Sequence, residues 1–371
     1  MGLFVNAYLH IPFCSSFCSY CDFTSFTGKE SIRPAYVSSL CDEIGASDLS
    51  GPLKTVYVGG GTPSLLEPNE LKRILDALRG RAGVREDAEV SMEANPESVD
   101  SARLTAFRKA GINRLSLGAQ SSQGRLLSEL SRCHDWSQVE KAARAAREAG
   151  IRDLSIDLMI GLPGQTVGMI RATLADTLAL SPDHLSVYAL QLEEGTPLAA
   201  RVRGGLPLPD DDETADQYGE VQSGLRDAGF AQYEVSNWCR PGHECRHNLA
   251  VWQGEDYWGF GVSAAGTRGL VRRTNTQELD RYLVAAGRDE GVEIETLPLP
   301  VKAFERVMLM LRTSRGVPEE EVAALLERSA AGQRRYETYL SEGWVVREGG
   351  RVHPSPAGYL RLHGLLEALM P

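Results

Sequence analysis

The chain has 371 residues, 42 % of them apolar, which is enough to bury one large core and a smaller one. Its 39 basic and 50 acidic residues give a net charge of −11, which argues against nucleic-acid binding because phosphate backbones require dense Lys and Arg. Neither a 20-residue apolar run nor a signal-peptide pattern occurs, so we predict no membrane span and a cytoplasmic location.

Residues 1–230 are expected to form the core domain, and from residue 5 to about 190 they alternate short β-rich runs with amphipathic stretches. Such runs, each followed by a helix, are typical of parallel strands joined by crossovers. Polar residues end nearly every run, as they do at the mouth of a barrel. The pattern therefore predicts an α/β fold, a partial (β/α)6 barrel. Its strands are expected at 6–11, 55–58, 89–93, 114–117, 154–159 and 184–189, and its helices at 34–44, 68–78, 101–110, 136–149 and 167–180.

The rest of the chain divides into two parts. An acidic helix at 210–228 leads into a connecting segment, 231–296, with a strand at 233–236 and a Trp-, Gly- and His-rich stretch. Residues 297–371 form a C-terminal domain that begins with a Leu-Pro-Leu-Pro linker at 297–300. Helices at 301–313, 318–327 and 333–342 and a hairpin at 344–353 make this domain winged-helix-like, but its acid-rich second helix disfavours DNA.

The strongest motif is Cys14-Ser-Ser-Phe-Cys18-Ser-Tyr-Cys21, directly after the first predicted strand. Thiolates suit iron–sulfur clusters or zinc, and structural zinc normally has a fourth protein ligand nearby. Phe23 stands where a fourth cysteine would be expected. Three thiolates on a cubane leave one iron open, so the spacing predicts a [4Fe-4S] cluster, with a zinc ribbon as the alternative. Cys41, Cys239 and Cys245 are expected to be structural.

This loop resembles that of the radical S-adenosylmethionine superfamily. The resemblance continues through Gly59-Gly-Gly61-Thr62-Pro63-Ser64 and through Asp157-Leu-Met-Ile-Gly-Leu-Pro-Gly164. It implies that S-adenosylmethionine chelates the open iron. Chemically, carboxylates can accept from its hydroxyls or ammonium, and an Arg can pair with its carboxylate. The cofactor contacts implied by the resemblance are Tyr8, Gly60, Gly61, Thr62, Glu93, Gln120, Arg132, Asp157 and Ala189.

Within the superfamily, the chain is most similar to the coproporphyrinogen III dehydrogenase branch. Phrases such as Tyr8-Leu-His-Ile-Pro-Phe-Cys14, Tyr233-Glu-Val-Ser-Asn237 and Cys245-Arg-His-Asn248 carry the similarity. Cys21-Asp22-Phe23 resembles the HemW family of heme chaperones, whereas the dehydrogenases continue with a fourth cysteine. Membership of that family implies a cluster, bound S-adenosylmethionine and heme, and delivery of heme to hemoproteins such as respiratory enzymes. It implies no catalytic residue.

The HemW resemblance also singles out a His-Asn-x-x-Tyr-Trp motif that is implicated in heme handling. Here it reads His247-Asn248-Leu-Ala-Val251-Trp252, and a second family pattern has Ala265 in place of a His. Because His imidazole is a common axial ligand of heme iron, His247 is the candidate heme contact. The alternative is a hydrogen-bonded histidine that pins this segment against the barrel.

Three functions remain open from the sequence. The first is a heme chaperone without coproporphyrinogen III dehydrogenase activity, which Phe23 favours. The second is a radical oxidoreductase acting on a tetrapyrrole such as coproporphyrinogen III. The third is a scaffold in which the cluster only stabilises the fold or a dimer. The sequence also leaves open the identity of the recipient hemoprotein, a homodimer, and peripheral membrane contact through client proteins.

Overall fold

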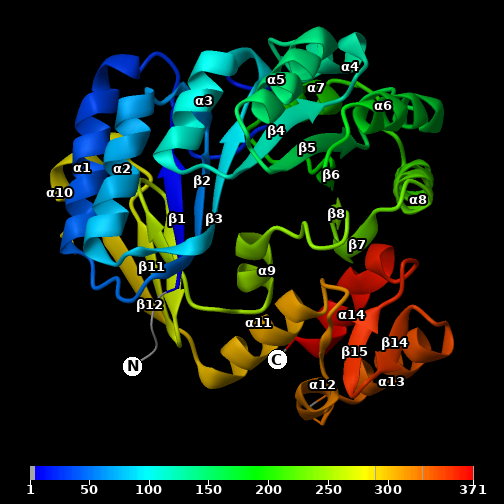
Figure 1. Ribbon diagram of the computed structural model, residues 1–371. Helices are drawn as coiled ribbons and strands as arrows, with labels where there is room; N and C mark the ends of the chain where they lie inside the picture. The colour runs from blue at the N-terminus through cyan, green and yellow to red at the C-terminus, as the bar shows by residue number, and fades with distance from the viewer. Residues whose placement is uncertain (1–4, 289, 328, 371) are drawn as a thin grey trace.

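A nine-stranded sheet forms the centre of the molecule in the computed structural model, which describes residues 5–288, 290–327 and 329–370 (Figure 1). The strands are ordered β7-β8-β6-β5-β4-β3-β2-β1-β9, and β1 to β6 are parallel neighbours. These six strands are β1 (Asn6–Ile11), β2 (Leu53–Gly60), β3 (Val84–Ala94), β4 (Arg114–Gln120), β5 (Asp153–Ile160) and β6 (His184–Ala189).

Helices connect these strands and cover the outer face of the sheet (Figure 1). They are α1 (Arg33–Ala46), α2 (Pro68–Arg81), α3 (Ser101–Ala110), α4 (Gly124–Glu129), α5 (Trp136–Glu148), α6 (Val167–Ala179), α7 (Pro197–Arg203) and α8 (Asp211–Asp227). Local chemistry sets their boundaries. For example, α2 begins with a capping box between Glu67 and Glu70 around Pro68, and α3 is followed by Gly111 at φ 127°. The predicted partial (β/α)6 architecture is therefore confirmed.

Residues 231–296 are integral to the barrel, although the sequence suggested only a connecting segment. The strand β8 (Asn237–Cys239) extends the sheet antiparallel to β6, and β7 (Ala231–Glu234) pairs antiparallel with β8. At the other edge, β9 (Trp258–Phe260) pairs parallel with β1. The expected strand at 233–236 thus lies two residues earlier. Between them runs α9 (Arg246–Trp252). The small sheet β10 (Ala265–Arg268), β11 (Val271–Asn275) and β12 (Val292–Thr296), with α10 (Leu279–Ala285), completes the segment.

The C-terminal part contains α11 (Leu299–Met310), β13 (Val317–Pro318), α12 (Glu319–Leu326), α13 (Ala330–Ser341), β14 (Val345–Glu348), β15 (Arg351–Pro354) and α14 (Leu362–Leu369). The predicted hairpin is present as the antiparallel pair β14 and β15. The predicted linker at 297–300 is wrong in its second half, because Leu299 and Pro300 already form the first turn of α11. Proline is well tolerated there, since its missing N–H has no partner in the first turn.

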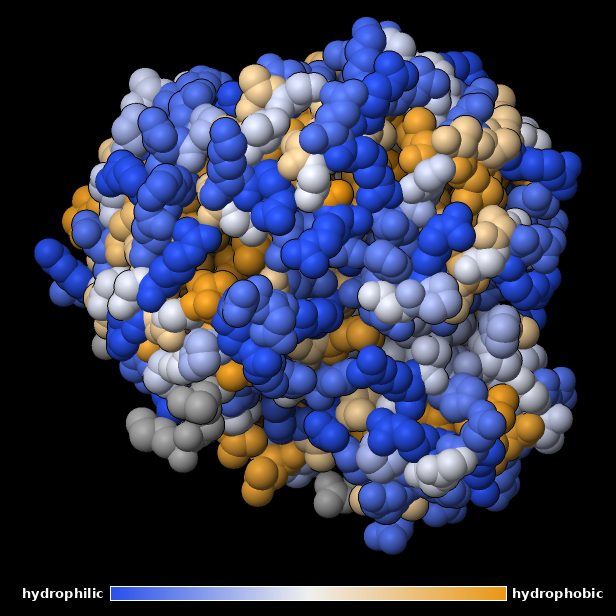
Figure 2. Space-filling model, in the orientation of Figure 1, coloured by the Kyte–Doolittle hydropathy of each residue, from blue (hydrophilic) through white to orange (hydrophobic). Residues whose placement is uncertain are grey.

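Two large hydrophobic cores stabilise the fold, beside two small clusters of buried residues. The larger lies between the sheet and the outer helices and includes Leu9, Val58, Leu71 and Phe107, and the smaller one belongs to the C-terminal helices and hairpin. The face seen in Figure 2 is mostly hydrophilic, with apolar patches between the charged groups. Among the described residues, no helix is both long enough and apolar enough to cross a bilayer.

Side-chain alternation makes the inside of the barrel polar. Strand residues of one parity point into the core, and those of the other parity point into the lumen. Along β2, for instance, Val56 and Val58 are buried in the core, whereas Thr55 and Tyr57 make polar contacts inside the barrel. The carboxyl ends of the parallel strands therefore deliver polar side chains to one mouth, as the sequence predicted.

Candidate functional site: a cavity at the barrel mouth

A cavity of about 540 Å³ lies at the carboxyl ends of the strands. Its size is within the range of small-molecule and cofactor sites. It gathers residues from the loop after β1 and from the ends of β2, β3, β4, β5 and β6. The predicted site residues that line it are Cys14, Cys18, Cys21, Gly60, Gly61, Thr62, Glu93, Gln120, Arg132, Asp157 and Ala189.

The cysteine loop is anchored by backbone hydrogen bonds. The amide of Cys14 donates to Phe26 O at 3.0 Å, and the amide of Ser19 donates to Leu130 O at 3.0 Å. Thr62 Oγ1 lies 3.6 Å from Cys14 Sγ, and Arg132 Nη1 donates to Cys18 Sγ at 3.5 Å. Burial raises the pKa of the Cys14 thiol and raises that of Cys21 to about 11. A bound metal would keep such thiols deprotonated.

The donor set fits a cubane better than a single metal ion. Among the described ranges, no three His, Cys, Asp or Glu side chains converge closely enough to hold one ion. In a cubane each thiolate binds a different iron, so three cysteines need only line a common cavity. The buried Arg132 Nε has no hydrogen-bond partner within the described part of the chain, so the cavity wall has a donor to offer a ligand. These residues fit a [4Fe-4S] cluster with an open iron.

The glycine triplet after β2 is required by close packing. A Cβ on Gly59 would lie 3.1 Å from the Glu93 carboxylate, and one on Gly60 would lie 2.8 Å from the His10 ring. A Cβ on Gly61 would meet Phe13 O at 2.8 Å and Cys14 Sγ at 2.9 Å. Gly60 also has φ 115°, a conformation that favours glycine. The triplet thus fits between the cysteine loop and Glu93.

Two carboxylates face the cavity from β3 and β5. Glu93 Oε1 accepts from the Tyr57 hydroxyl at 2.9 Å, and its Oε2 accepts from the Gly60 amide at 3.1 Å. Burial raises the pKa of Glu93 to about 7, even though these two hydrogen bonds lower it. Burial also raises the pKa of Asp157, whose oxygens accept from Ser116 at 2.8 and 2.9 Å. A cationic ligand would favour the ionised form of both.

The end of β4 and the following loop supply an amide and a guanidinium. Gln120 has φ 63°, an uncommon conformation for a residue other than glycine, at a point where the pairing with β5 shifts register. Arg132 Nη2 donates to Asn95 Oδ1 at 2.8 Å and to Gly118 O at 2.6 Å. Backbone strain of this kind tends to occur at ligand sites.

Tyr8 does not line the main cavity. It lies in an adjoining cavity of about 370 Å³, which shares Gly60 and Glu93 with the main one. The Tyr8 hydroxyl is 3.1 Å from His10 Nδ1, and His10 Nε2 is 2.8 Å from Thr24 O. His10 therefore contacts the loop that follows the cysteines and packs against Gly60.

His247 also lies outside the main cavity. Its side chain is buried, with 5 % of the residue exposed, and its Nδ1 is 2.8 Å from Thr55 Oγ1. Desolvation lowers its pKa to about 3, so the ring is neutral. A heme contact through His247 would require α9 to leave the barrel. Two other histidines are engaged by the protein as well: His134 Nε2 is 3.1 Å from Ala119 O, and His243 Nδ1 is 2.6 Å from Asp153 Oδ1.

Sequence reasoning missed the aromatic side chains around the mouth. Phe17 and Phe23 in the cysteine loop are 54 % and 65 % exposed, and Tyr188 at the end of β6 lines the same cavity. The sequence does contain an indication of them, since Phe17 and Phe23 flank Cys18 and Cys21 in a predicted loop. Their exposure depends on the tertiary arrangement and could not be read from the sequence.

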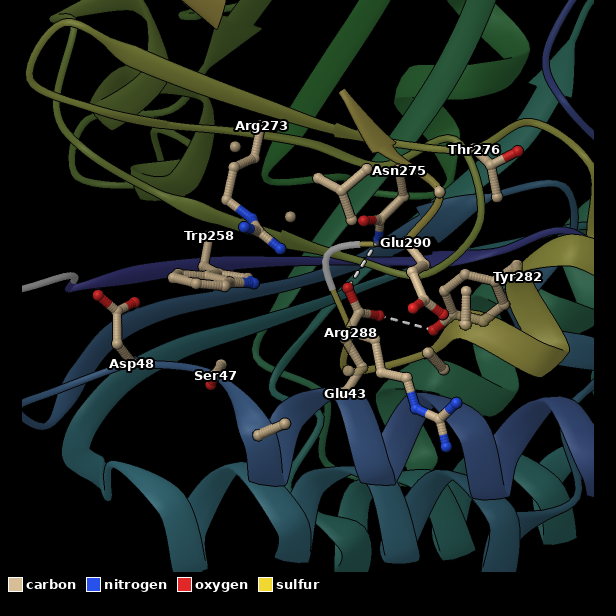
Figure 3. A pocket seen from close by; sticks show the side chains of 18 of the residues that line it. Glu43, Ser47, Asp48, Trp258, Arg273, Asn275, Thr276, Tyr282, Arg288 and Glu290 are labelled. Atoms are coloured by element: carbon tan, nitrogen blue, oxygen red, sulfur yellow. Dashed lines mark hydrogen bonds between the residues drawn. The ribbon is translucent and has the colours of Figure 1, made fainter. Parts of the chain in front are cut away.

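A second cavity, of about 420 Å³, lies between α1, α10 and the β10–β12 sheet (Figure 3). Its buried Glu43 carboxylate accepts from Tyr282 at 2.6 Å, from Asn275 at 2.7 Å and from the Gly261 amide at 2.9 Å. None of the predicted site residues lines it. Since Glu43 is fully engaged by the protein, we assign it a structural role.

Comparison with known proteins is consistent with this geometry. Residues 8–177 match the model of the radical SAM superfamily, and residues 297–361 match that of the HemN C-terminal domain. The chain is 39 % identical to the heme chaperone HemW of Mycobacterium tuberculosis, over 98 % of this chain and 94 % of that one. It is 32 % identical to the Escherichia coli heme chaperone HemW, over 94 % and 95 % of the two chains.

Among solved structures, coproporphyrinogen III oxidase (HemN) from Escherichia coli, a radical SAM enzyme, superimposes with a TM-score of 0.84. The superposition covers 99 % of this chain and 90 % of that one. At 24 % sequence identity this likeness supports the fold, including the C-terminal domain, and does not extend to activity.

Proposed function

The chain belongs to the HemW family of the radical SAM superfamily, and from that membership we propose that it is a heme chaperone that binds a [4Fe-4S] cluster, S-adenosylmethionine and heme. The observation that carries this proposal is the similarity to heme chaperones over nearly the full chain. We propose that the heme is passed to recipient hemoproteins, such as respiratory enzymes.

The cavity at the barrel mouth supports the first two ligands. Cys14, Cys18 and Cys21 would hold the cluster, whose open iron would bind S-adenosylmethionine. Around it, the contacts that we propose for the cofactor come from carboxylates, an amide, a guanidinium and glycine backbone. They are Gly60, Gly61, Thr62, Glu93, Gln120, Arg132, Asp157 and Ala189, with Tyr8 acting from the adjoining cavity.

The position of Phe23 favours a chaperone over an oxidoreductase. It occupies the place of the fourth cysteine and is exposed beside the cavity.

We propose three functional parts of the chain. Residues 1–230 would bind the cluster and the cofactor, residues 231–296 would carry the motif segment, and residues 297–371 would form the C-terminal domain. We also propose a cytoplasmic location, because the thiolates of an iron–sulfur cluster require a reducing compartment.

The test uses anaerobically purified protein loaded with its cluster. Titration with heme should give a saturable Soret band, and mixing with an apo-hemoprotein should move the heme to that acceptor. A matched incubation with coproporphyrinogen III, S-adenosylmethionine and dithionite should give no protoporphyrinogen. Turnover in that incubation, or the absence of heme binding, would overturn the proposal. Size-exclusion chromatography with and without heme distinguishes a monomer from a homodimer.

A further inference from the structure

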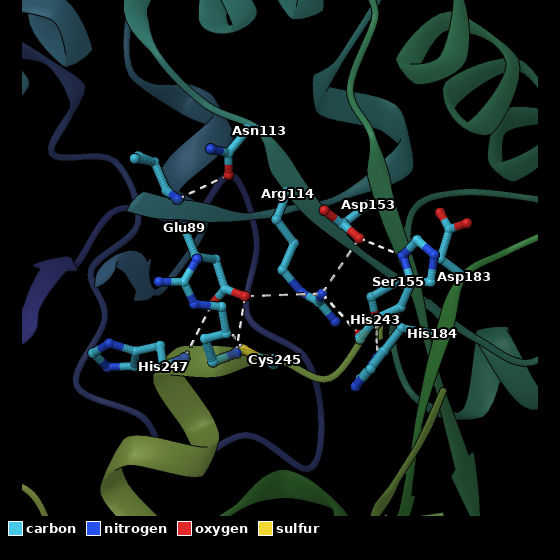
Figure 4. A network of polar contacts seen from close by, with 12 residues as sticks. Glu89, Asn113, Arg114, Asp153, Ser155, Asp183, His184, His243, Cys245 and His247 are labelled. Carbon is cyan, nitrogen blue, oxygen red and sulfur yellow. Dashed lines mark hydrogen bonds and ion pairs between the residues drawn. The ribbon is translucent and has the colours of Figure 1, made fainter. Parts of the chain in front are cut away.

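The motif helix α9 is held inside the amino-terminal end of the barrel by a buried acid (Figure 4). Glu89 of β3 accepts from the amides of Arg246 at 2.9 Å and His247 at 3.0 Å. Arg114 Nη1 lies 4.0 Å from Glu89 Oε2 and donates to His243 O at 3.1 Å. Because these partners are buried strand residues, the position of His247 is fixed relative to the barrel.

A chain of hydrogen bonds then fixes the His247 ring. Thr55 Oγ1 donates to Asn6 Oδ1 at 2.9 Å, and the Asn6 amide group donates to Glu255 and to Asp256 O, both at 3.2 Å. Since the Thr55 proton is used in this way, His247 Nδ1 must carry the proton that is shared with Thr55 at 2.8 Å. The ring orientation follows from this assignment.

Tyr57 links this ring to the cofactor cavity. Its ring stacks on His247 with centroids 5.2 Å apart and an interplanar angle of 28°, and it stacks on Tyr8 at 6.2 Å. Its hydroxyl donates to Glu93 Oε1 at 2.9 Å. The rings of His247 and Tyr8 thus both stack on the Tyr57 ring, whose hydroxyl is directed at the Glu93 carboxylate.

We infer that His247 and Tyr57 are positioning residues that orient the Glu93 carboxylate toward S-adenosylmethionine. The inference rests on the proposed function, in which Glu93 contacts that cofactor. It gives the histidine of the motif a role within the barrel and couples α9 to the cofactor site through one stacked ring and one hydrogen bond. Movement of α9 would release Tyr57 and thereby loosen the cofactor.

The test measures S-adenosylmethionine affinity by calorimetry in anaerobic protein of verified cluster content. Tyr57→Phe removes only the hydroxyl, and we expect roughly tenfold weaker binding, since the cationic cofactor would keep the Glu93 acceptor of this bond ionised. His247→Ala should weaken binding to a similar extent. His247→Phe keeps a ring against Tyr57 and should stay within about threefold of wild type. Tyr218→Phe is the control, because its buried hydroxyl donates to Val235 O, away from the cavity.

A double-mutant cycle separates positioning from general stability. In a Glu93→Ala background, Tyr57→Phe should change the affinity by less than about twofold, because the group on which it acts is gone. Full additivity, or wild-type affinity of both Tyr57→Phe and His247→Ala, would overturn the inference. If Glu93→Ala alone binds like wild type, the proposed cofactor contact fails and the inference falls with it, whereas a normal Glu93→Ala loss with additive effects removes the inference alone.

Discussion

The anchoring of α9 by Glu89 offers a test of how the barrel is closed. Glu89→Ala leaves two amide groups, those of Arg246 and His247, without their acceptor. It also removes one of the two carboxylates that lie 4.0 Å from the buried Arg114. Unpaired donors cost about 1–3 kcal/mol each, and breaking a buried ion pair costs about 3–5 kcal/mol. Asp153 remains 4.0 Å from Arg114 and offsets part of this loss. We therefore expect the free energy of unfolding to fall by about 5 kcal/mol, the lower end of the combined range.

Urea denaturation followed by tryptophan fluorescence measures this change, since Trp238 is buried in the barrel core. The matched control is Glu86→Ala, which removes an exposed glutamate from the same strand, β3, and should change the unfolding free energy by less than about 0.5 kcal/mol. A decrease of less than about 1 kcal/mol in the unfolding free energy of Glu89→Ala would contradict this expectation, because it would mean that water replaces Glu89 as the acceptor at the start of α9.

Three further predictions concern the cavity, the glycine triplet beside it and Glu234, a buried residue of β7. Glu93→Ala, Gln120→Ala and Asp157→Ala should each weaken S-adenosylmethionine binding by about 5- to 150-fold in calorimetry, with iron content unchanged; wild-type affinity in all three would contradict the cavity assignment. Gly61→Ala should lower iron content, because its Cβ would lie 2.9 Å from Cys14 Sγ, whereas Gly45→Ala in α1 meets no atom within 4 Å and should leave iron unchanged. Burial raises the pKa of Glu234 from 4.5 to about 7, so the unfolded chain releases this proton first, and stability should fall by about 3 kcal/mol as pH rises from 4.5 to 7. Glu234→Gln should remove that contribution, and an unchanged pH profile of the unfolding free energy in this variant would show that Glu234 is not its source.

Much of the fold could be predicted because each parallel strand carries a local signal. The apolar runs at 6–11 and 184–189 coincide with β1 and β6, and helix 101–110 coincides with α3. The cysteine loop and the strand-end residues that spacing and resemblance single out line one cavity. Tyr8 and His247 lie outside that cavity, which the sequence could not show, because the face on which a side chain lies depends on the register between distant strands.

The remaining features depend on long-range pairing. The pairing of β9 with β1 brings Trp258 beside Ala7, although most of the sequence lies between them. A strand of three residues carries no local pattern that would predict this pairing. Nothing in the sequence distinguishes Tyr57 from other strand residues, and only its contacts with His247 and Glu93 give it a role. The prediction of a linker at 297–300 is wrong for Leu299 and Pro300, because proline is common both in loops and in the first turn of helices.

A [4Fe-4S] cluster held by three cysteines in this cavity is the feature on which the proposed function depends. Iron and sulfide analysis of anaerobically purified protein tests it most directly, with the visible spectrum recorded on the same samples. We expect about four irons and four sulfides per chain, and loss of the brown chromophore when Cys14, Cys18 or Cys21 is replaced by Ala. Cys41→Ala, in α1, should keep the full complement. A complete cluster in Cys18→Ala would contradict the account.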